Sequence, residues 1–474
     1  MIKNHLTVAW RNLLRNKSQA LINIGGLALG LAAFIFILQY INLERNVNRF
    51  HVNISNTYRL INEDNKGTTW PEIEPGYALK AKERCPEIKS FCRFENGIAQ
   101  GIVRNVEKNL SYQEQKIGYA EGNFFEFFSF PLIAGDASSL KRSDVMFISA
   151  TSAKKYFGND YPINKTLALA NQFGTKVYSI GGVFEDMGDN SDIKYDMVFS
   201  LNALDNPDVQ KYIDWAALNN LESQYINTFF ELEEHADYKQ VEKKLIDLRN
   251  ELDKDKDGII FRLQPFSEVH MAKRSGDTYL HYAQRKYVFI LGAIALLILL
   301  IAWFNYINFS TAQSLKRAGE VGVRKVIGAT GRNLVAQFLW ESILVNFIGF
   351  VFSISLVSML QPLFNDLIGK QLSWHALFSD SSWLMGFGLI VLGSLVSGGY
   401  AAYVLANFNP VLTLKGKLLK GGGGTILRKV LVVSQFAISI ALIIGTIGVF
   451  YQLKFMQQKD LGFSSDQLLV IQSP

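Results

Sequence analysis

Charged residues are scarce in this chain. They make up 19% of its 474 residues, whereas 49% are hydrophobic and the mean hydropathy is +0.11. A soluble globular domain usually carries about 25% charged residues. The composition therefore excludes an ordinary soluble protein and directs attention to the longest uncharged runs of the sequence.

Motifs for several kinds of chemistry are absent. No GxxxxGK[ST] motif occurs, and the glycine run at 421–424 is followed by Thr425 without the lysine that would reach a bound phosphate, so it indicates a flexible linker. We find no nucleophile elbow, zinc-ligand spacing, paired catalytic carboxylates or nucleic-acid-binding motif, and the six histidines are scattered. We therefore expect no catalytic, cofactor-binding or metal site in this chain and no nucleic-acid partner.

Only two cysteines occur, Cys85 and Cys92, on either side of Pro86. A disulfide could bridge a turn between them, because both fall in a region that we place outside the cytoplasm below. Two buried free thiols are the alternative, since spacing alone does not fix the geometry of a bridge.

The segment DKDKDG at 253–258 has the acidic residues and the glycine that open a calcium-binding loop. Gln264 stands where that loop requires a bidentate glutamate. A charged turn between a helix at 241–252 and a strand at 259–263 explains the same residues, and we favour the turn.

Five hydrophobic runs are long enough to cross a membrane. At about 1.5 Å per residue, about 20 residues span about 30 Å of hydrocarbon. Glu341 is the one charged residue inside these runs. They lie at 20–42, 287–309, 334–360, 383–406 and 430–453.

Lysine and arginine residues indicate the orientation of these spans. They gather before the first span, between the second and third, and between the fourth and fifth, and such an excess marks cytoplasmic loops. The same loops account for the net charge of +6. We expect a multi-pass protein of a bacterial inner membrane, with a cytoplasmic N-terminus and the segment after the first span in the periplasm. The first run is about twice as long as the apolar core of a signal peptide, so we expect an uncleaved anchor.

The sequence predicts an α-helical transmembrane bundle with an inserted α/β periplasmic domain. Residues 3–17 have the pattern of a basic amphipathic helix at the membrane surface, and residues 43–285 alternate strand-like and helix-like runs. The expected segments are a cytoplasmic amphipathic helix at 1–19, a span at 20–42, the periplasmic domain at 43–285, spans two to four at 286–406 with a cytoplasmic loop at 315–333, a cytoplasmic linker at 407–429, a fifth span at 430–453, and the start of a truncated second periplasmic unit at 454–474.

The cytoplasmic loop KRAGEVGVRKVIGATGRN, from Lys316 to Asn333, has the features of a short helix. Glu320 and Arg324 stand four residues apart in the order that favours an ion pair, and Gly328 can end the turn. Apolar residues between charges suit docking into a groove of a partner. On charge alone, a loop that only obeys the positive-inside pattern is the favoured alternative.

The residues around this loop resemble a known family. NYINFSTAQSLKRAGEVGVRKVIGATGRNLVAQFLWESIL, at 305–344, is similar to the signature region of the FtsX/MacB-type ABC transporter permeases. SGGYAAYVLANFNPVLTLKG and LRKVLVVSQFAISIAL are similar to the family's fourth and fifth spans. NFFEFFSFPLIAGD, SAKKYFGNDYPINKTL and GGVFEDMGDNSDIKYD resemble its periplasmic core domain, so the likeness covers nearly the whole chain.

This resemblance implies a permease subunit that couples ATP hydrolysis by a separate cytoplasmic ABC ATPase to movement of its periplasmic domain. ATP would be bound by that partner, not by this chain. Other implied partners are membrane lipid, a second copy or related permease half, and a periplasmic or outer-membrane protein. The resemblance assigns the coupling helix on the ATPase to Glu320, Val321, Gly322, Val323, Arg324, Lys325, Val326, Ile327 and Gly328.

The sequence leaves a second class of function open. A membrane-anchored sensor or scaffold, with an external domain that binds a ligand without ATP, would show the same spans and domain. The resemblance at 305–344 favours the permease. The family repeats its spans and domain, so we also expect this chain to end inside a second unit.

Overall fold

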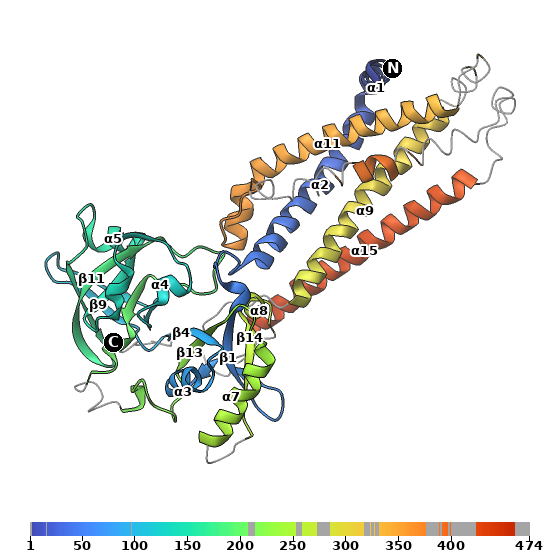
Figure 1. The fold of residues 1–474 in the computed structure, drawn as a ribbon. Helices are drawn as coiled ribbons and strands as arrows, with labels where there is room; N and C mark the ends of the chain where they lie inside the picture. The colour runs from blue at the N-terminus through green and yellow to red at the C-terminus, as the bar shows by residue number, and fades with distance from the viewer. Residues whose placement is uncertain are drawn as a thin grey trace. The chain divides into compact units, whose positions relative to one another are not determined.

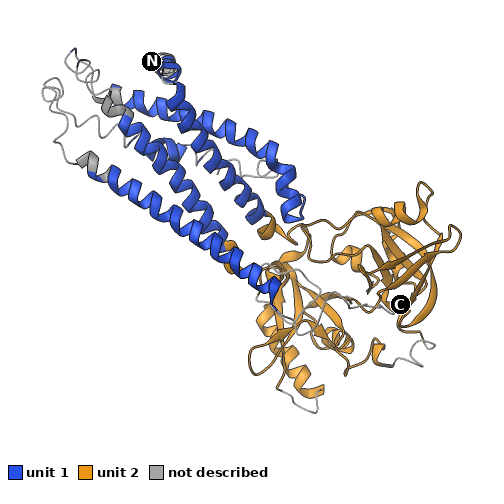
Figure 2. Cartoon of the chain, turned by 180° about the vertical axis from the view of Figure 1, so that it is seen from behind, with its two compact units in different colours: residues 1–42, 289–468 blue, residues 43–288, 469–474 orange. Residues whose placement is uncertain are grey.

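The computed structural model of the chain describes residues 2–15, 17–95, 97–206, 214–252, 258–272, 285–316, 331–375 and 423–459, together with 323, 327, 388, 391–396 and 399. The chain divides into two compact units (Figure 2). Unit 1 holds Met1–Asn42 and Phe289–Leu468, and unit 2 holds Leu43–Val288 and Leu469–Pro474.

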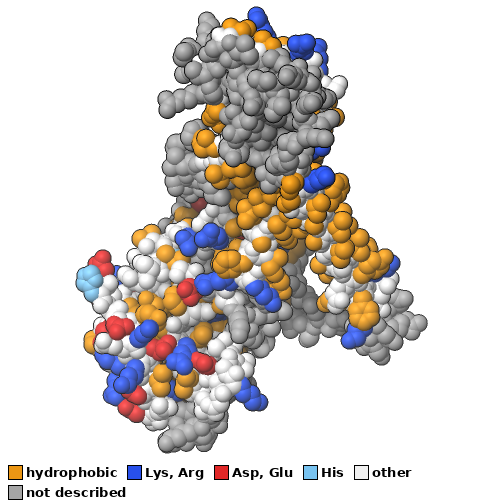
Figure 3. Space-filling model, turned by 90° about the vertical axis from the view of Figure 1, so that its right-hand side faces the viewer, with side chains coloured by type: hydrophobic (Ala, Val, Ile, Leu, Met, Phe, Trp, Pro, Cys, Tyr) orange, Lys and Arg blue, Asp and Glu red, His pale blue; other side chains and the backbone are white. Residues whose placement is uncertain are grey.

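Unit 1 is built from helices. Its described helices are α1 (Ile2–Arg15), α2 (Lys17–Asn46), α9 (Arg285–Lys316), α11 (Gly331–Ile368) and α15 (Gly423–Gln458) (Figure 1). Within the described residues, four stretches are long and apolar enough to cross a membrane: Lys17–Asn46, Arg285–Ala312, Val335–Ile368 and Arg428–Gln458. Figure 3 shows hydrophobic side chains gathered over the outer faces of these helices.

These four helices confirm four of the five expected spans, and α1 is helical where the amphipathic helix is expected. The remaining expected span, at 383–406, lies mostly outside the described residues. Its described part is helical at 391–396.

Small residues let α2 and α9 pack closely. A Cβ atom added at Gly30 would lie 2.6 Å from Cβ of Ala302, which is closer than two carbon atoms can approach. Around this point, buried Leu27, Leu31 and Trp303 form a cluster between the helices. Gly26 and Gly30, which have the small-xxx-small spacing, therefore face a neighbouring helix, and Gly30 is the position that requires glycine.

Unit 2 is organised around a mixed β-sheet. Among the described residues its strands follow the order β14-β1-β13-β4-β7-β12-β9-β11-β10-β5-β6, with β2, β3 and β8 attached to β1, β13 and β11. The pairs β9–β11 and β7–β12 are parallel, and the other pairs are antiparallel. The strands are β1 (Thr57–Glu63), β2 (Thr69–Trp70), β3 (Glu72–Ile73), β4 (Ile88–Phe94), β5 (Gly101–Asn105), β6 (Leu110–Glu114), β7 (Ile117–Ala120), β8 (Leu132–Gly135), β9 (Val145–Ser149), β10 (Thr166–Asn171), β11 (Gly174–Phe184), β12 (Met197–Ser200), β13 (Ile226–Leu232) and β14 (Ile260–Pro265).

Helices cover parts of this sheet. α3 and α7 pack with β4 and β14 around a core that includes Tyr77, Phe230 and Leu245. The helix expected at 241–252 is thus confirmed within α7. The described helices of this unit are α3 (Gly76–Arg84), α4 (Phe124–Phe127), α5 (Ala150–Phe157), α7 (Tyr238–Leu252) and α8 (Phe266–Val269), with short 3₁₀ turns at Ile54–Asn56, Ala137–Lys141, Leu201–Ala203 and Asp214–Ala216.

A phenylalanine-rich cluster fills the middle of unit 2. The run NFFEFFSF folds into α4 and the turn after it, and it buries Phe124 and Phe128 against Phe94 of β4 and Phe229 of β13. Phe266 of α8 closes the same cluster from the segment that precedes α9. Residues far apart in the sequence are thereby held on one apolar core, which stabilises the region where the chain enters and leaves the domain.

The sheet has two halves, one that ends with β4 and one that begins with β7, and they meet at a narrow point. β4 and β7 share the single pair Phe94–Ala120. Beside it, buried Arg93 donates to Glu121 at 2.8 Å and to the backbone carbonyls of Pro75 and Leu218 at 3.0 and 2.9 Å. Two further backbone hydrogen bonds lie beside this pair, from the N–H of Glu95 to the carbonyl of Tyr119 at 3.0 Å and from the N–H of Glu121 to the carbonyl of Arg93 at 2.8 Å. The Arg93–Glu121 ion pair adds a side-chain connection between the halves.

Candidate functional site

A buried ionic cluster lies where the chain enters and leaves unit 2. Glu44 belongs to the last turn of α2, and His270 directly follows α8, 15 residues before the start of α9. Nε2 of His270 lies 2.7 Å from Oε2 of Glu44, and its Nδ1 lies 2.6 Å from Oδ1 of Asp192. The side chains are 7%, 2% and 2% exposed, so the cluster is shielded from solvent.

The two carboxylates favour a charged imidazole. Burial lowers the pKa of His270, but hydrogen bonds to Asp192 and Glu44 outweigh it and raise the pKa to about 9. At neutral pH both ring nitrogens therefore carry a proton and donate to a carboxylate. The imidazolium joins the end of α2 to the loop after β11.

Asn48 adds a second connection to the same loop. Its Nδ2 donates to Oδ2 of Asp192 at 2.8 Å, its Oδ1 accepts from the backbone N–H of Asp192 at 3.0 Å, and its own N–H donates to the carbonyl of Asn190 at 2.8 Å. Asn48 has φ of 64°, a left-handed conformation that asparagine adopts more readily than most residues. The chain thus turns directly after α2 and is fixed at that turn by an asparagine and an aspartate.

His51 anchors the following residues on the phenylalanine-rich cluster. Its Nδ1 bonds to the backbone carbonyl of Phe128, and its ring stacks on Phe266 with 4.9 Å between centroids. Burial lowers the pKa of His51 to about 4, against smaller opposing effects of that carbonyl and of Asp192. This histidine is neutral at neutral pH, in contrast to His270.

The charged groups of this cluster hold one another in place. Its acids and its histidine are saturated by one another, and the described residues contain no group of three or more metal-ligating side chains arranged to hold an ion. A buried ion pair is sensitive to the loss of either partner and therefore fixes one geometry. We identify Glu44, Asn48, Asp192 and His270 as the candidate functional site, and name them the entry cluster.

The structure describes two residues of the predicted coupling segment. Val323 and Ile327 are 46% and 80% exposed. The N–H of Ile327 donates to the carbonyl of Val323 at 3.0 Å, which is the hydrogen bond of one α-helical turn. Glu320, Val321, Gly322, Arg324, Lys325, Val326 and Gly328 lie outside the described residues, so the role of the segment stays a prediction.

The two cysteines are free thiols in the structure, which is one of the two alternatives that the sequence left open. Cys85 ends α3 and is buried with α3 and α7, whereas Cys92 lies in β4 and is buried in the phenylalanine-rich cluster. The remaining candidate, the acidic run of the calcium-like segment at 253–257, lies outside the described residues.

Sequence reasoning missed the entry cluster. Glu44 and His270 are 226 residues apart, and Asp192 is 78 residues from His270. No spacing rule joins such positions. Two signals were present: Glu44 is the first acidic residue of the chain and follows a span directly, and Asp192 lies within the GGVFEDMGDNSDIKYD stretch.

Comparison with known proteins gives two adjoining matches. Residues 20–248 match the MacB-like periplasmic core domain, and residues 292–410 match the FtsX-like permease C-terminal domain. The macrolide export ATP-binding/permease protein MacB of Bdellovibrio bacteriovorus is 23% identical over 433 residues, which cover 87% of this chain and 61% of that protein. The MacB protein of Pasteurella multocida is 25% identical over 218 residues, or 44% of this chain and 31% of that protein. The chain therefore spans less than two thirds of the length of these relatives.

Solved structures cover part of the chain. A domain of a putative permease protein from Porphyromonas gingivalis is 21% identical, covers 45% of this chain and 92% of that domain, and has a TM-score of 0.38. The periplasmic region of MacB from Actinobacillus actinomycetemcomitans is 15% identical, covers 44% of this chain and 88% of that region, and has a TM-score of 0.32.

Together, the apolar helices and the sheet domain between the first two of them define a multi-span membrane protein with an inserted α/β domain. The matches to the periplasmic core domain and to the permease domain specify the class further. The chain belongs to the FtsX/MacB-type family of ABC transporter permeases.

Proposed function

We propose that this chain is a permease subunit that couples ATP hydrolysis by a separate cytoplasmic ATPase to a conformational change of its periplasmic domain. The continuity of α2 into the entry cluster is the observation that carries this proposal. α2 has 30 residues and is about 45 Å long at about 1.5 Å per residue, whereas the hydrocarbon layer is about 30 Å thick. One unbroken helix therefore contains the first span and Glu44.

Movement of α2 can be passed on to the periplasmic domain only if the end of α2 is fixed to that domain. Glu44 is paired with His270, and Asn48, two residues beyond the end of α2, is bonded to Asp192. A shift of α2 along its axis or about it would move the loop after β11 and the segment before α9 together, because the entry cluster joins all three. Movement of the span would in this way change the geometry of the periplasmic domain.

On the cytoplasmic side of the membrane, the segment 320–328 is proposed to contact the ATPase. The exposure of Val323 and Ile327 within one helical turn suits insertion into a groove, and neighbouring charges would fix the orientation. The positive-inside pattern supports a cytoplasmic position for this loop and for the N-terminus in a bacterial inner membrane. A second copy or a related half, and a periplasmic or outer-membrane protein, are proposed as further partners.

Substitution at Arg324 tests the proposal. The chain is expressed with the ABC ATPase that co-purifies with it, the complex is reconstituted in vesicles, and ATP hydrolysis is compared between the wild type and Arg324→Glu. Reversal of this charge should abolish the hydrolysis that depends on the permease, while Arg428→Glu, a charge reversal at the exposed start of α15, should leave it unchanged. Hydrolysis that is unaffected by Arg324→Glu would contradict the proposed coupling.

A further inference from the structure

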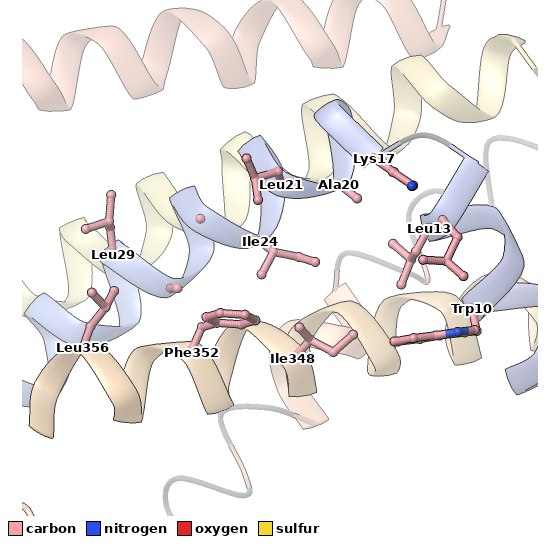
Figure 4. A pocket seen from close by; sticks show the side chains of 13 residues that line it. Trp10, Leu13, Lys17, Ala20, Leu21, Ile24, Leu29, Ile348, Phe352 and Leu356 are labelled. Atoms are coloured by element: carbon pink, nitrogen blue, oxygen red, sulfur yellow. The ribbon is translucent and has the colours of Figure 1, made fainter. Parts of the chain in front are cut away.

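An apolar groove of about 520 Å³ lies between α1, α2 and α11 in unit 1. This volume falls within the range of about 300–1,000 Å³ typical of small-molecule sites. Figure 4 shows Trp10, Leu13 and Lys17 at one end of the groove and Leu29 and Leu356 at the other. Among the described residues that line the groove, Lys17 is the one charged residue. The apolar lining includes Leu13, Ile24, Leu29, Ile348, Phe352 and Leu356.

The length of the groove corresponds to one leaflet of a bilayer. From Lys17 to Leu29 the groove follows α2 for 12 residues, or about 18 Å at about 1.5 Å per residue. Half of the hydrocarbon layer is about 15 Å. An acyl chain that entered the groove beside Leu29 would therefore bring its headgroup to the level of Lys17.

Charge decides which lipid is preferred at this position. Lipid tails are as apolar as leucine, so exchange of an acyl chain between the bilayer and the groove is close to neutral. Selectivity must therefore come from the headgroup. Residues 1–43, which hold α1 and most of α2, contain Lys3, Arg11, Arg15 and Lys17 and no aspartate or glutamate, so the α1–α2 side of the mouth of the groove is purely basic in sequence.

We propose that this groove is a binding site for one anionic phospholipid, with an acyl chain along α2 and α11 and the phosphate at Lys17. Trp10 lies at the headgroup end, where its amphipathic ring is suited to the interface between apolar core and headgroups. Occupation would fill the space between α1, α2 and α11 and so set the position of α1 against the first span.

Gly25 provides a way to close the groove without disturbing the fold. It lines the groove, and a Cβ atom added there meets no atom within 4 Å, so a larger side chain would extend into open space. Leucine is also a better helix former than glycine. Gly25→Leu should therefore exclude an acyl chain and leave α2 intact. Gly445→Leu is a matched control, because Gly445 lies in α15 and also has open space around it.

Quenching of Trp10 by brominated lipids tests the site. The full chain and its Trp10→Phe variant are reconstituted in vesicles that contain increasing fractions of phosphatidylglycerol or phosphatidylcholine with brominated acyl chains. The difference in fluorescence between the two proteins isolates Trp10 from the other six tryptophans. One lysine should favour the anionic lipid about fivefold, so half-maximal quenching should occur at an about fivefold lower fraction of phosphatidylglycerol.

The variants separate the contributions of charge and space. Lys17→Gln should remove the preference for phosphatidylglycerol, and Gly25→Leu should reduce the quenching of Trp10 by both lipids. Lys429→Gln, a charge removal at the start of α15, and Gly445→Leu should behave as the wild type. Equal quenching by the two lipids in the wild type, or a preference that survives Lys17→Gln, would overturn the proposal, because the groove would then hold bulk lipid without selection. Quenching that is unchanged in Gly25→Leu would overturn it as well.

Discussion

Replacement of His270 should weaken unit 2 by removing the cation of the entry cluster. In His270→Gln the carboxylates of Glu44 and Asp192, each 2% exposed, lose the charge that compensates them. Loss of one partner of a buried ion pair costs about 3–5 kcal/mol. The rise in the pKa of His270 from 6.5 to about 9, at about 1.4 kcal/mol per pKa unit, independently gives about 3 kcal/mol.

Amide hydrogen exchange of the reconstituted chain measures this cost. A loss of about 3 kcal/mol should accelerate exchange about 100-fold in the turn after α2 and in the slowest amides of β13. His235→Gln is the matched control, because His235 is an exposed histidine of the same unit. Rates in His270→Gln within twofold of the wild type would refute the reasoning that the entry cluster holds this region together.

A double variant isolates the pair itself. Glu44→Gln with His270→Gln should cost less than the sum of the two single substitutions. His270→Gln alone leaves both Glu44 and Asp192 without the imidazolium, whereas the double variant leaves only Asp192 without it. Asp192 keeps its hydrogen bonds to Asn48 in all three variants.

The raised pKa of His270 predicts that the stability of unit 2 falls at alkaline pH. Its pKa is higher in the folded protein, about 9, than the ordinary value of 6.5. The stability that it contributes is therefore complete below pH 6.5 and is lost as the pH rises from 6.5 through about 9. Exchange measured between pH 6 and pH 9.5, corrected for the intrinsic rate, should show this loss in the wild type and not in His270→Gln.

Three further perturbations follow from the structure. His51 has a folded pKa of about 4, below its ordinary 6.5. The stability that its neutral ring contributes is therefore present above pH 6.5 and is lost as the pH falls through 4. In His51→Gln, acid unfolding followed by tryptophan fluorescence should shift to lower pH. Gly30→Val should lower the thermal stability of the detergent-solubilised chain, because α2 cannot then approach α9, whereas Gly25→Ala should leave the melting temperature unchanged or slightly raised. Arg93→Ala should lower the free energy of unfolding by about 3–5 kcal/mol, since it leaves Glu121 and two backbone carbonyls without their donor at the narrow point of the sheet. Proteolysis between the two halves of the sheet should then accelerate. A cleavage rate equal to that of the wild type would contradict this role of Arg93.

Much of the fold could be predicted from local sequence patterns. A membrane span is defined by about 20 consecutive apolar residues, so the hydrophobic runs located α2, α9, α11 and α15 without any tertiary information. The periodicity at 241–252 similarly located α7. These features depend on neighbours in the sequence, and the solvent or the lipid selects them directly.

The entry cluster depends on the opposite kind of information. A buried histidine and a surface histidine look alike in one sequence, and only the folded chain brings His270 beside Glu44, 226 residues away. The order of the strands shows the same limit, since β1 pairs with β13 and β14, strands from the far end of the domain. Long-range pairing of this kind follows from the packing of the whole domain rather than from a local motif.

Nucleotide-dependent hydrogen exchange across the complex tests the coupling most directly. The chain is reconstituted with its ATPase, and exchange is compared with and without a non-hydrolysable ATP analogue, both in the wild type and in Arg324→Glu. The proposed mechanism predicts that the analogue changes exchange both in the segment around Val323 and Ile327 and in the turn that holds Asn48 and His51, and that Arg324→Glu abolishes the second change. Exchange in the turn that is the same with and without nucleotide, while the ATPase is bound and active, would contradict it.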